Sequence, residues 1–288
     1  MKAGQPSRGR AIALVLGCLS AAVFGADPSV ALEMHGRVLF LKASINNQGP
    51  FRLILDTGAT ETVITPPVAN RLGIRTVAVS ASQRKGTVAS LAVGTAAVTN
   101  LPVYVFDPPQ AVSLRLDEGA DYHGLLGYTF LSRFLTTLDY GLMQVSFTPL
   151  PTRSIRVRAD GTDSNGVPFE VVEHLIRIPV RVNGSALLRF LFDTGSAEVV
   201  LFPPTARALG FPASPPGDAS PRFAEAASVS IGTARMSRVR VVAAEIPDAR
   251  VTGNFQGIIG HPFLSNFAIA INYRDRVIRL SPASRPLQ

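Results

Sequence analysis

Asp56-Thr57-Gly58 stands in the first half of this chain, and Asp193-Thr194-Gly195 stands in the second half. Each triplet closes a short apolar run, at residues 53–55 and 190–192. One such triplet is a weak signal, because its residue types are common where a strand turns into a loop. Two in matched surroundings predict two carboxylates that meet at a pseudo-two-fold axis, as a metal-free acid–base pair requires. Asp56 and Asp193 are therefore the candidate catalytic residues.

The matched surroundings belong to a longer internal repeat. Residues 53–73 laid on 190–210 without a gap give ten identities in 21 positions. Both copies contain a Pro-Pro pair and end in Leu-Gly, which predicts a short helix directly after each triplet. Apolar runs upstream of the triplets end at asparagine-containing turns and predict hairpins. Further on, both halves carry two apolar residues and a glycine, at 125–127 and 258–260.

Composition favours an all-β protein with a sizeable core. Of the 288 residues 47% are hydrophobic, and 24 glycines and 22 prolines separate short runs of valine, isoleucine and leucine. The repeat predicts an N-terminal lobe over 34–150 and a C-terminal lobe over 169–284. Residues 151–168 have turn composition and are the expected linker.

The first 26 residues resemble a secretory signal. Three basic residues precede an apolar run that ends in small residues. We expect an exported protein, periplasmic or secreted, with candidate cleavage contexts at residues 20–22 and 23–25. Two alternatives stay open: an uncleaved membrane anchor, or a lipoprotein tethered through Cys18, the only cysteine, because residues 15–18 loosely resemble a lipobox.

The charge pattern argues against a nucleic-acid partner. The formal net charge of +8 includes the three basic residues of the signal and so falls to about +5 without them. The remaining arginines are spread singly along apolar runs, with no basic block and no basic–aromatic interleaving.

With the repeat in view, the chain resembles the aspartic proteases of the pepsin and retropepsin clan, as a single-chain tandem of two retropepsin-like units. The resemblance implies a bilobal acid-protease fold with the active site between the lobes. It also implies an aspartic endopeptidase that acts on peptide or protein substrates without metal or cofactor. Because both aspartates come from one chain, we expect a monomer. The two aspartates would share one proton.

The resemblance also assigns supporting roles around the two aspartates. Thr57 and Thr194 would tie the two turns together across the lobe interface. Gly58 and Gly195 would let the chain turn sharply beside the carboxylates. Ala59 in the first copy is replaced by Ser196 in the second, and Ser196 is expected to give Asp193 an additional hydrogen bond.

A flap hairpin is expected over the site, between the short helix and the following Gly-Thr strand. In the first lobe the candidate is Val79–Ser90 with a turn at 83–86, which makes Arg84, Lys85 and Gly86 candidate substrate-binding residues. The matching stretch, Ser214–Ala226, is rich in proline and alanine and less hairpin-like. The first lobe is therefore expected to carry the flap, with a plain solvated loop as the alternative.

Other hydrolytic sites find little support. The chain has no Gly-x-Ser-x-Gly stretch. Its four histidines are isolated and lack metal-site spacing, although two of them lie near the apolar-apolar-Gly triplets; they are His35, His123, His174 and His261. The alternative that stays open is an exported peptide-binding protein that keeps this fold but is catalytically silent.

Overall fold

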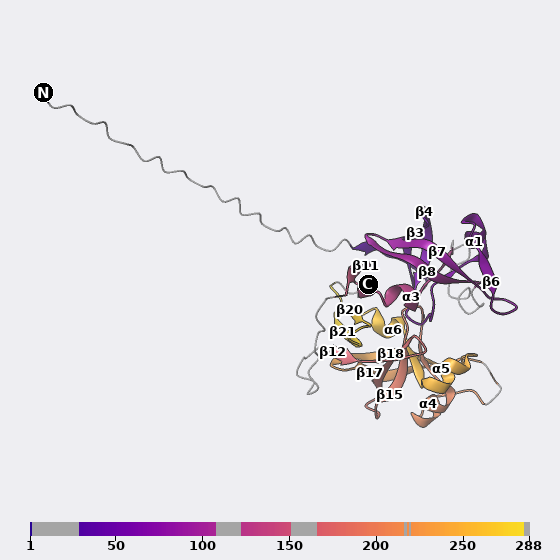
Figure 1. The fold of residues 1–288 in the computed structure, drawn as a ribbon. Coiled ribbons are helices and arrows are strands. Elements are labelled where there is room, and N and C mark those ends of the chain that lie inside the picture. The colour runs from indigo at the N-terminus through magenta and orange to yellow at the C-terminus, as the bar shows by residue number, and fades with distance from the viewer. Residues whose placement is uncertain (2–28, 108–121, 151–165, 216–217, 219, 285–288) are drawn as a thin grey trace.

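Two closed β-barrels form the body of the protein, one from each half of the sequence (Figure 1). The computed structural model describes the chain outside residues 2–28, 108–121, 151–165, 216–217, 219 and 285–288. In each half, six strands close into a barrel, because one strand of the second long hairpin also pairs with the first long strand. The predicted all-β, bilobal fold is confirmed.

The first barrel is built from strands of residues 33–126. Its elements are β2 (Glu33–His35), β3 (Val38–Ile45), β4 (Gln48–Leu55), β5 (Val63–Ile64), α1 (Pro66–Arg71), β6 (Thr76–Ala78), β7 (Arg84–Val93), β8 (Ala96–Val105) and β9 (Gly124–Leu126), followed by α3 (Tyr128–Leu131). The ring closes through the pairing of β3 with β7.

The second barrel repeats this order. Its elements are β13 (Glu170–Val172), β14 (Leu175–Val182), β15 (Leu188–Phe192), β16 (Val199–Leu201), α4 (Pro203–Ala208), β17 (Arg222–Ile231), β18 (Ala234–Ala243), α5 (Ala249–Asn254) and β19 (Gly257–Ile259), followed by α6 (His261–Leu264). Here β14 pairs with β17 to close the ring.

The local signals of the sequence explain several of these elements. Both predicted helices after the Asp-Thr-Gly triplets are present, as α1 and α4, each with proline in its first turn. Each is followed by a glycine at positive φ, Gly73 at +62° and Gly210 at +76°. The predicted hairpins are present too. In the first lobe, Asn46 and Asn47 both adopt positive φ and join β3 to β4 in a two-residue turn.

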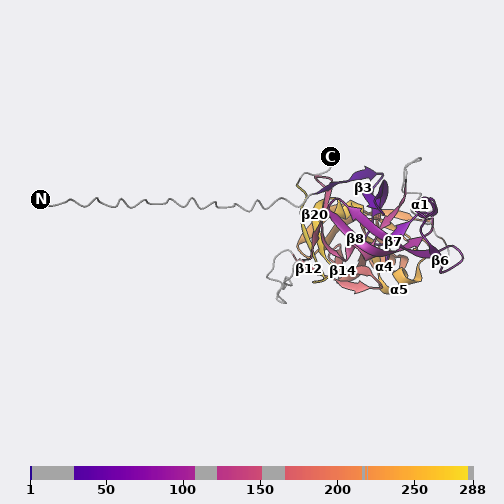
Figure 2. The ribbon, with the colours of Figure 1, turned by 45° about the horizontal axis from the view of Figure 1, so that its top comes forward.

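A third sheet joins the two halves. Its six strands are β1 (Val30–Ala31), β11 (Gln144–Pro149), β10 (Phe134–Asp139), β20 (Phe267–Asn272), β21 (Val277–Pro282) and β12 (Gly166–Pro168), in that spatial order. The two halves meet where β10 pairs antiparallel with β20. Figures 1 and 2 show this sheet on the opposite flank of the molecule from β6 and α5.

The predicted lobe boundaries, 34–150 and 169–284, stay a prediction, since the shared sheet draws strands from both halves. The predicted signal segment and residues 151–165 of the predicted linker lie outside the described residues. Residues 166–168, which the prediction placed in the linker, form β12 and pair with β21. No helix in the described part of the chain is long and apolar enough to cross a membrane.

A β-hairpin is present in the first lobe where the flap was predicted, but its turn lies earlier than predicted. β6 pairs with β7, and residues 79–83 form the connection, closed by the bond from the Val79 N–H to the Gln83 carbonyl. The Ser80 hydroxyl accepts a further bond from the Gln83 N–H, so a serine shapes the turn. Gly86, taken from the sequence as a turn residue, instead pairs with Thr76 within the strands.

Candidate active site

The two Asp-Thr-Gly triplets lie at the ends of equivalent strands. Asp56 follows β4, and its N–H donates to the Leu126 carbonyl of the neighbouring parallel strand β9, at 3.1 Å. Asp193 follows β15 and makes the same bond to Ile259 of β19, also at 3.1 Å. The apolar-apolar-Gly triplets thus hold the start of each turn in place.

Each aspartate is fixed by its own turn. The Gly58 N–H donates to Oδ1 of Asp56 at 2.8 Å, and the Gly195 N–H donates to Oδ1 of Asp193 at the same distance. Hydrogen bonds to a carboxylate favour its ionised form. The turns therefore orient one oxygen of each carboxyl group.

The two threonines tie the turns to each other across the lobe interface. The Thr57 hydroxyl donates to the Phe192 carbonyl at 2.9 Å and accepts from the Thr194 N–H at 3.0 Å. The Thr194 hydroxyl donates to the Leu55 carbonyl at 2.8 Å and accepts from the Thr57 N–H at 3.1 Å. Both threonines are buried. Four buried hydrogen bonds thus fix the position of one turn relative to the other.

The glycines bring the two carboxyl groups into one place. A Cβ atom on Gly58 would lie 2.5 Å from Cγ of Asp193, and one on Gly195 would lie 2.6 Å from Cγ of Asp56. Each carboxyl group therefore packs against the turn that carries the other aspartate. No larger residue than glycine fits this close approach.

The expected contribution of Ser196 is wrong. The Ser196 hydroxyl donates to the Glu198 carbonyl at 3.0 Å, so its proton is directed away from Asp193. The reason is local: Ser196 is almost completely buried, and the Glu198 carbonyl lies in the same turn. Because its only proton is used within its own turn, Ser196 stabilises that turn.

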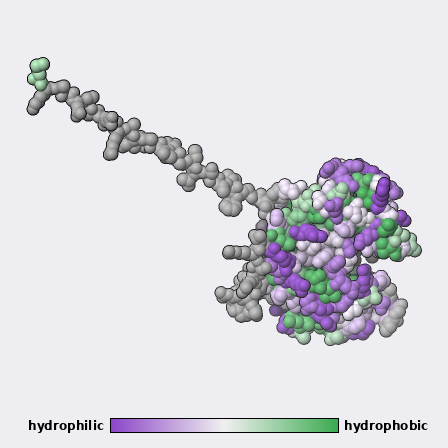
Figure 3. Space-filling view, in the orientation of Figure 1, coloured by the Kyte–Doolittle hydropathy of each residue, from purple (hydrophilic) through white to green (hydrophobic). Residues whose placement is uncertain are grey.

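A cavity of about 560 Å³ opens beside Asp56. Apolar side chains of both lobes form much of its wall, including Val63, Leu125 and Leu175, and Tyr104 and Phe106 extend it on the first lobe. Figure 3 shows the surface hollowed between the two halves of the molecule, on the flank where Figure 1 places β6 and α5. Asp56 therefore borders an open cavity whose wall comes from both lobes.

The predicted flap residues lie near this cavity but do not line it. Gln83, at the end of the flap turn, does line it. The Arg84 side chain donates to Thr76, the Lys85 ammonium lies 5.6 Å from the centre of the Tyr104 ring, and Gly86 packs against residues 74–76. These three residues contact neighbouring segments of the first lobe.

Sequence reasoning missed the second-lobe side of the cavity. Asp248 and Arg250 line it from the start of α5, a helix that the sequence did not predict. The Asp248 side chain caps α5 by accepting from the Arg250 N–H at 2.9 Å, and it also binds the Arg250 guanidinium at 2.8 Å. Asp248 is a residue type that often caps a helix, and this weak signal is the only one in the sequence for α5.

Two buried tyrosines interact electrostatically with the aspartates. They are equivalent in the repeat, Tyr140 and Tyr273, and neither hydroxyl has a hydrogen-bond partner among the described residues. Burial raises the pKa of Tyr140, and the negative charge of Asp193 raises it further. Burial likewise raises the pKa of Tyr273, with smaller contributions from Tyr128 and Asp56. Both phenols therefore stay protonated beside the aspartates.

Two histidines near the apolar-apolar-Gly triplets have different surroundings. His123 accepts the Arg52 N–H through Nδ1 and contacts the Phe51 ring edge-on, so it is a structural residue. His261 begins α6 beside Tyr140, and neither of its ring nitrogens has a partner in the described structure. Burial, with the nearby charge of Arg37, lowers the pKa of His261 to about 4.

Replacing His261 with phenylalanine should increase stability in acid. In the unfolded chain a histidine gains its proton near pH 6.5, whereas folded His261 does so near pH 4. The unfolded state is therefore favoured progressively as pH falls from 6.5 to 4, by up to about 2 kcal/mol after allowance for partial exposure. Urea unfolding at pH 7, 5 and 4 should show a growing advantage for His261→Phe. A constant difference between variant and wild type would contradict this.

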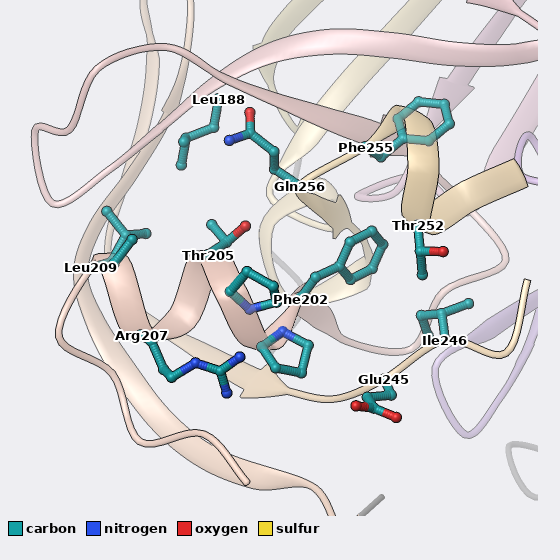
Figure 4. A pocket seen from close by; sticks show the side chains of 13 residues that line it. Leu188, Phe202, Thr205, Arg207, Leu209, Glu245, Ile246, Thr252, Phe255 and Gln256 are labelled. Atoms are coloured by element: carbon teal, nitrogen blue, oxygen red, sulfur yellow. The ribbon is translucent and has the colours of Figure 1, made fainter. Parts of the chain in front are cut away.

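A second pocket lies entirely in the second lobe, on another side of α5 (Figure 4). It measures about 610 Å³, and Phe202 and Phe255 contribute to its largely apolar wall. Neither Asp56 nor Asp193 lines it. In the part of the chain that the structure describes, no group of three or more histidine, cysteine, aspartate or glutamate side chains is placed to hold a metal ion. The candidate active site is the cavity beside the aspartates.

The fold and the paired turns define the class: a bilobal all-β protein with one carboxyl group from each lobe at the interface. A sequence model of the family described as aspartyl protease matches residues 41–130 and 178–263, once in each half. The chain belongs to this aspartyl protease family, and the expected relation to the pepsin and retropepsin clan is confirmed.

A solved structure agrees with the fold. The crystal structure of an aspartic proteinase from Irpex lacteus is similar over 90% of this chain and 98% of that protein, with a TM-score of 0.53 and 12% sequence identity. Basic 7S globulin from soybean is similar over 88% of this chain and 93% of that one, with a TM-score of 0.49 and 10% identity. No curated protein sequence matches the chain significantly.

Proposed function

We propose that this chain is an exported aspartic endopeptidase whose Asp56 and Asp193 form the catalytic pair. The observation that carries the proposal is the reciprocal packing of the turns, in which each carboxyl group lies against the glycine of the other triplet. The four threonine bonds keep that arrangement rigid. An aspartic protease in general follows from the family, and the paired turns support Asp56 and Asp193 as the residues of the proposed chemistry.

The reaction proposed for this pair is hydrolysis by an activated water. Two carboxyl groups this close do not both ionise readily, so they share one proton at acidic pH. The ionised member takes a proton from the water that attacks the scissile carbonyl carbon. The protonated member donates to the carbonyl oxygen as it gains negative charge. Asp56 and Asp193 then exchange roles as the amine leaves with a proton.

The cavity supports a peptide as substrate. An extended backbone entering between the lobes would lie below Gln83 and against Tyr104, with its scissile bond beside Asp56. Closure of the flap over this bond would exclude bulk water and fix the geometry of attack. Peptide or protein chains are the proposed partners, and a monomer is sufficient because one chain supplies both aspartates.

Export is proposed from the first 26 residues alone, because they have the charged, apolar and small-residue order of a secretory signal. The proposed location is the periplasm or the medium. Mass spectrometry of the mature protein tests this: an N-terminus at Val23 or Asp27 supports cleaved export, whereas a lipidated Cys18 supports the tethered alternative. An intact N-terminus on purified membrane fractions would overturn cleavage.

A silent peptide-binding protein is the second candidate. The discriminating experiment incubates the purified chain, without residues 1–26, with a proteome-derived peptide library at pH 3.5, 4.5 and 5.5. New peptide ends detected by mass spectrometry support the endopeptidase. Peptides retained on the protein without new ends support the silent alternative. Terminal trimming alone would contradict the endopeptidase as well.

A further inference from the structure

Two equivalent hairpin tips cross from one lobe to the other beside the active site. Arg37, between β2 and β3 of the first lobe, places Nη1 3.0 Å from Oε1 of Glu198 in the second lobe. His174, between β13 and β14 of the second lobe, places Nδ1 3.7 Å from Oε1 of Glu61 in the first lobe. Both glutamates follow their aspartate by five residues. The repeat has thus built the same inter-lobe contact twice.

The two contacts differ in their chemistry. The Arg37 guanidinium is always charged, and Arg240 adds a second cation 3.6 Å from Glu198. The His174 imidazole attracts Glu61 as a cation only when it is protonated, and histidine side chains ordinarily change charge between pH 5 and 8. The first contact therefore always joins opposite charges, whereas the second does so only with a protonated imidazole.

The conformation of the second hairpin tip is unusual for its residues. Glu173 has a φ of +50° and His174 has a φ of +69°, in the left-handed region that few residues other than glycine adopt and that is least usual here for Glu173. Two-residue turns of this kind normally hold asparagine, aspartate or glycine, and the matching turn of the first lobe has Gly36 at +59°. Strain of this sort is concentrated at functional positions, where a particular side chain is required.

His174 is placed where its contact affects the substrate cavity. Its ring stacks on Tyr128 at 4.3 Å with an interplanar angle of 6°, and Tyr128 in turn contacts Tyr273, the buried phenol near Asp56. Glu61 and His174 both line the cavity.

Other charged groups line the same cavity as His174. Arg250 is bound by Asp248, and Glu173 and Asp56 are acidic. Glu61 is the only one of these acids that forms an ion pair with His174. The contact therefore connects a wall from the second lobe to the turn that carries Asp56.

We propose that His174 is a positioning residue that, through Glu61, holds the cavity beside Asp56 in the shape that binds substrate when the imidazole is charged. This inference rests on the proposed function. It predicts a pH dependence of substrate binding that is separate from the ionisation of the catalytic pair. The matched substitution comes from the chain itself, since the equivalent hairpin carries arginine, which can also stack on Tyr128.

The test measures binding of a hexapeptide with a Leu-Phe hydroxyethylene isostere, which cannot be cleaved, by calorimetry at pH 5 and 7.5. Comparing variants at each pH cancels the contribution of the catalytic pair. A half-exposed ion pair accounts for up to about a fivefold change in affinity. His174→Arg should match wild type at pH 5 and bind about three- to fivefold more tightly at pH 7.5. His174→Gln should show the opposite, weaker at pH 5 and equal at pH 7.5.

A Glu61→Gln background provides the control. Because the partner carboxylate is absent there, His174→Arg should have no effect at either pH. An equal ratio of affinities at the two pH values, or an effect that persists without Glu61, overturns the inference. If the wild-type protein does not bind the hexapeptide, the inference is overturned as well. Cleavage of the library peptides is scored separately, so binding with the expected pattern but no cleavage would reject only the endopeptidase.

Discussion

Replacing Asp56 with asparagine is expected to lower kcat for peptide cleavage by at least about 10³-fold, and Asp193→Asn is expected to do the same. Asparagine keeps the shape of the side chain but neither gains nor loses a proton at working pH. Without one carboxyl group, the pair has no member to accept the proton of water or none to donate to the carbonyl oxygen. The double variant should be no worse than either single variant, because the two groups act as a unit. Initial rates at pH 4.5 on the best-cleaved library peptide measure this.

The variants need a fold control and a matched acid. Both should unfold in urea within about 1 kcal/mol of wild type, since removal of carboxyl–carboxyl repulsion offsets altered hydrogen bonds. Asp218→Asn, at a second-lobe residue that does not line the cavity, should leave kcat unchanged. If either active-site variant keeps more than a tenth of the wild-type kcat, the shared pair is not the catalytic centre.

Gly58→Ala should cause the second large loss, a fall of about 10²-fold or more in kcat/KM. The added methyl group would lie 2.5 Å from Cγ and 2.6 and 2.7 Å from the two oxygens of Asp193. That carboxyl group has little room to retreat, because the Gly195 N–H holds it at 2.8 Å. The turn must shift, which separates the two carboxyl groups and costs about 1–3 kcal/mol of unfolding free energy. Steady-state kinetics and urea unfolding measure the two effects.

Gly253→Ala is the matched control for added bulk. Gly253 lies in α5, and a Cβ there would meet nothing within 4 Å. Alanine favours helix over glycine by roughly 0.5–1 kcal/mol, so this variant should be slightly more stable and fully active. Gly195→Ala, in contrast, should repeat the loss seen for Gly58→Ala, because it meets Asp56 in the same way. Wild-type kinetics for either active-site variant would show that the turns are not packed as described.

Much of the fold was predictable because local signals and the repeat agree. The proline pairs start α1 and α4, and the asparagine turns set the register of the long hairpins. Alignment of the halves then made Asp56 and Asp193 equivalent. What the sequence left open depends on contacts between distant segments. No local pattern says that β10 pairs with β20 across the halves, or that α5 borders the cavity.

The errors have similar causes. Gly86 looked like a turn residue, yet glycine is also tolerated in a strand where neighbours approach closely, and here Ile74 does so. Ser196 looked like a partner for Asp193, but the Glu198 carbonyl accepts its hydroxyl proton. The pairing of His174 with Glu61 could not be read from spacing at all, because it depends on how two separately folded barrels meet.

The most direct test of the shared catalytic pair is a crystal structure of the chain with the hydroxyethylene hexapeptide bound. The isostere places a hydroxyl group where the attacked carbonyl would lie. We expect this hydroxyl within hydrogen-bonding distance, about 2.5–3.0 Å, of carboxyl oxygens from both Asp56 and Asp193. A peptide bound elsewhere, or a hydroxyl in contact with only one of the two carboxyl groups, would contradict the account.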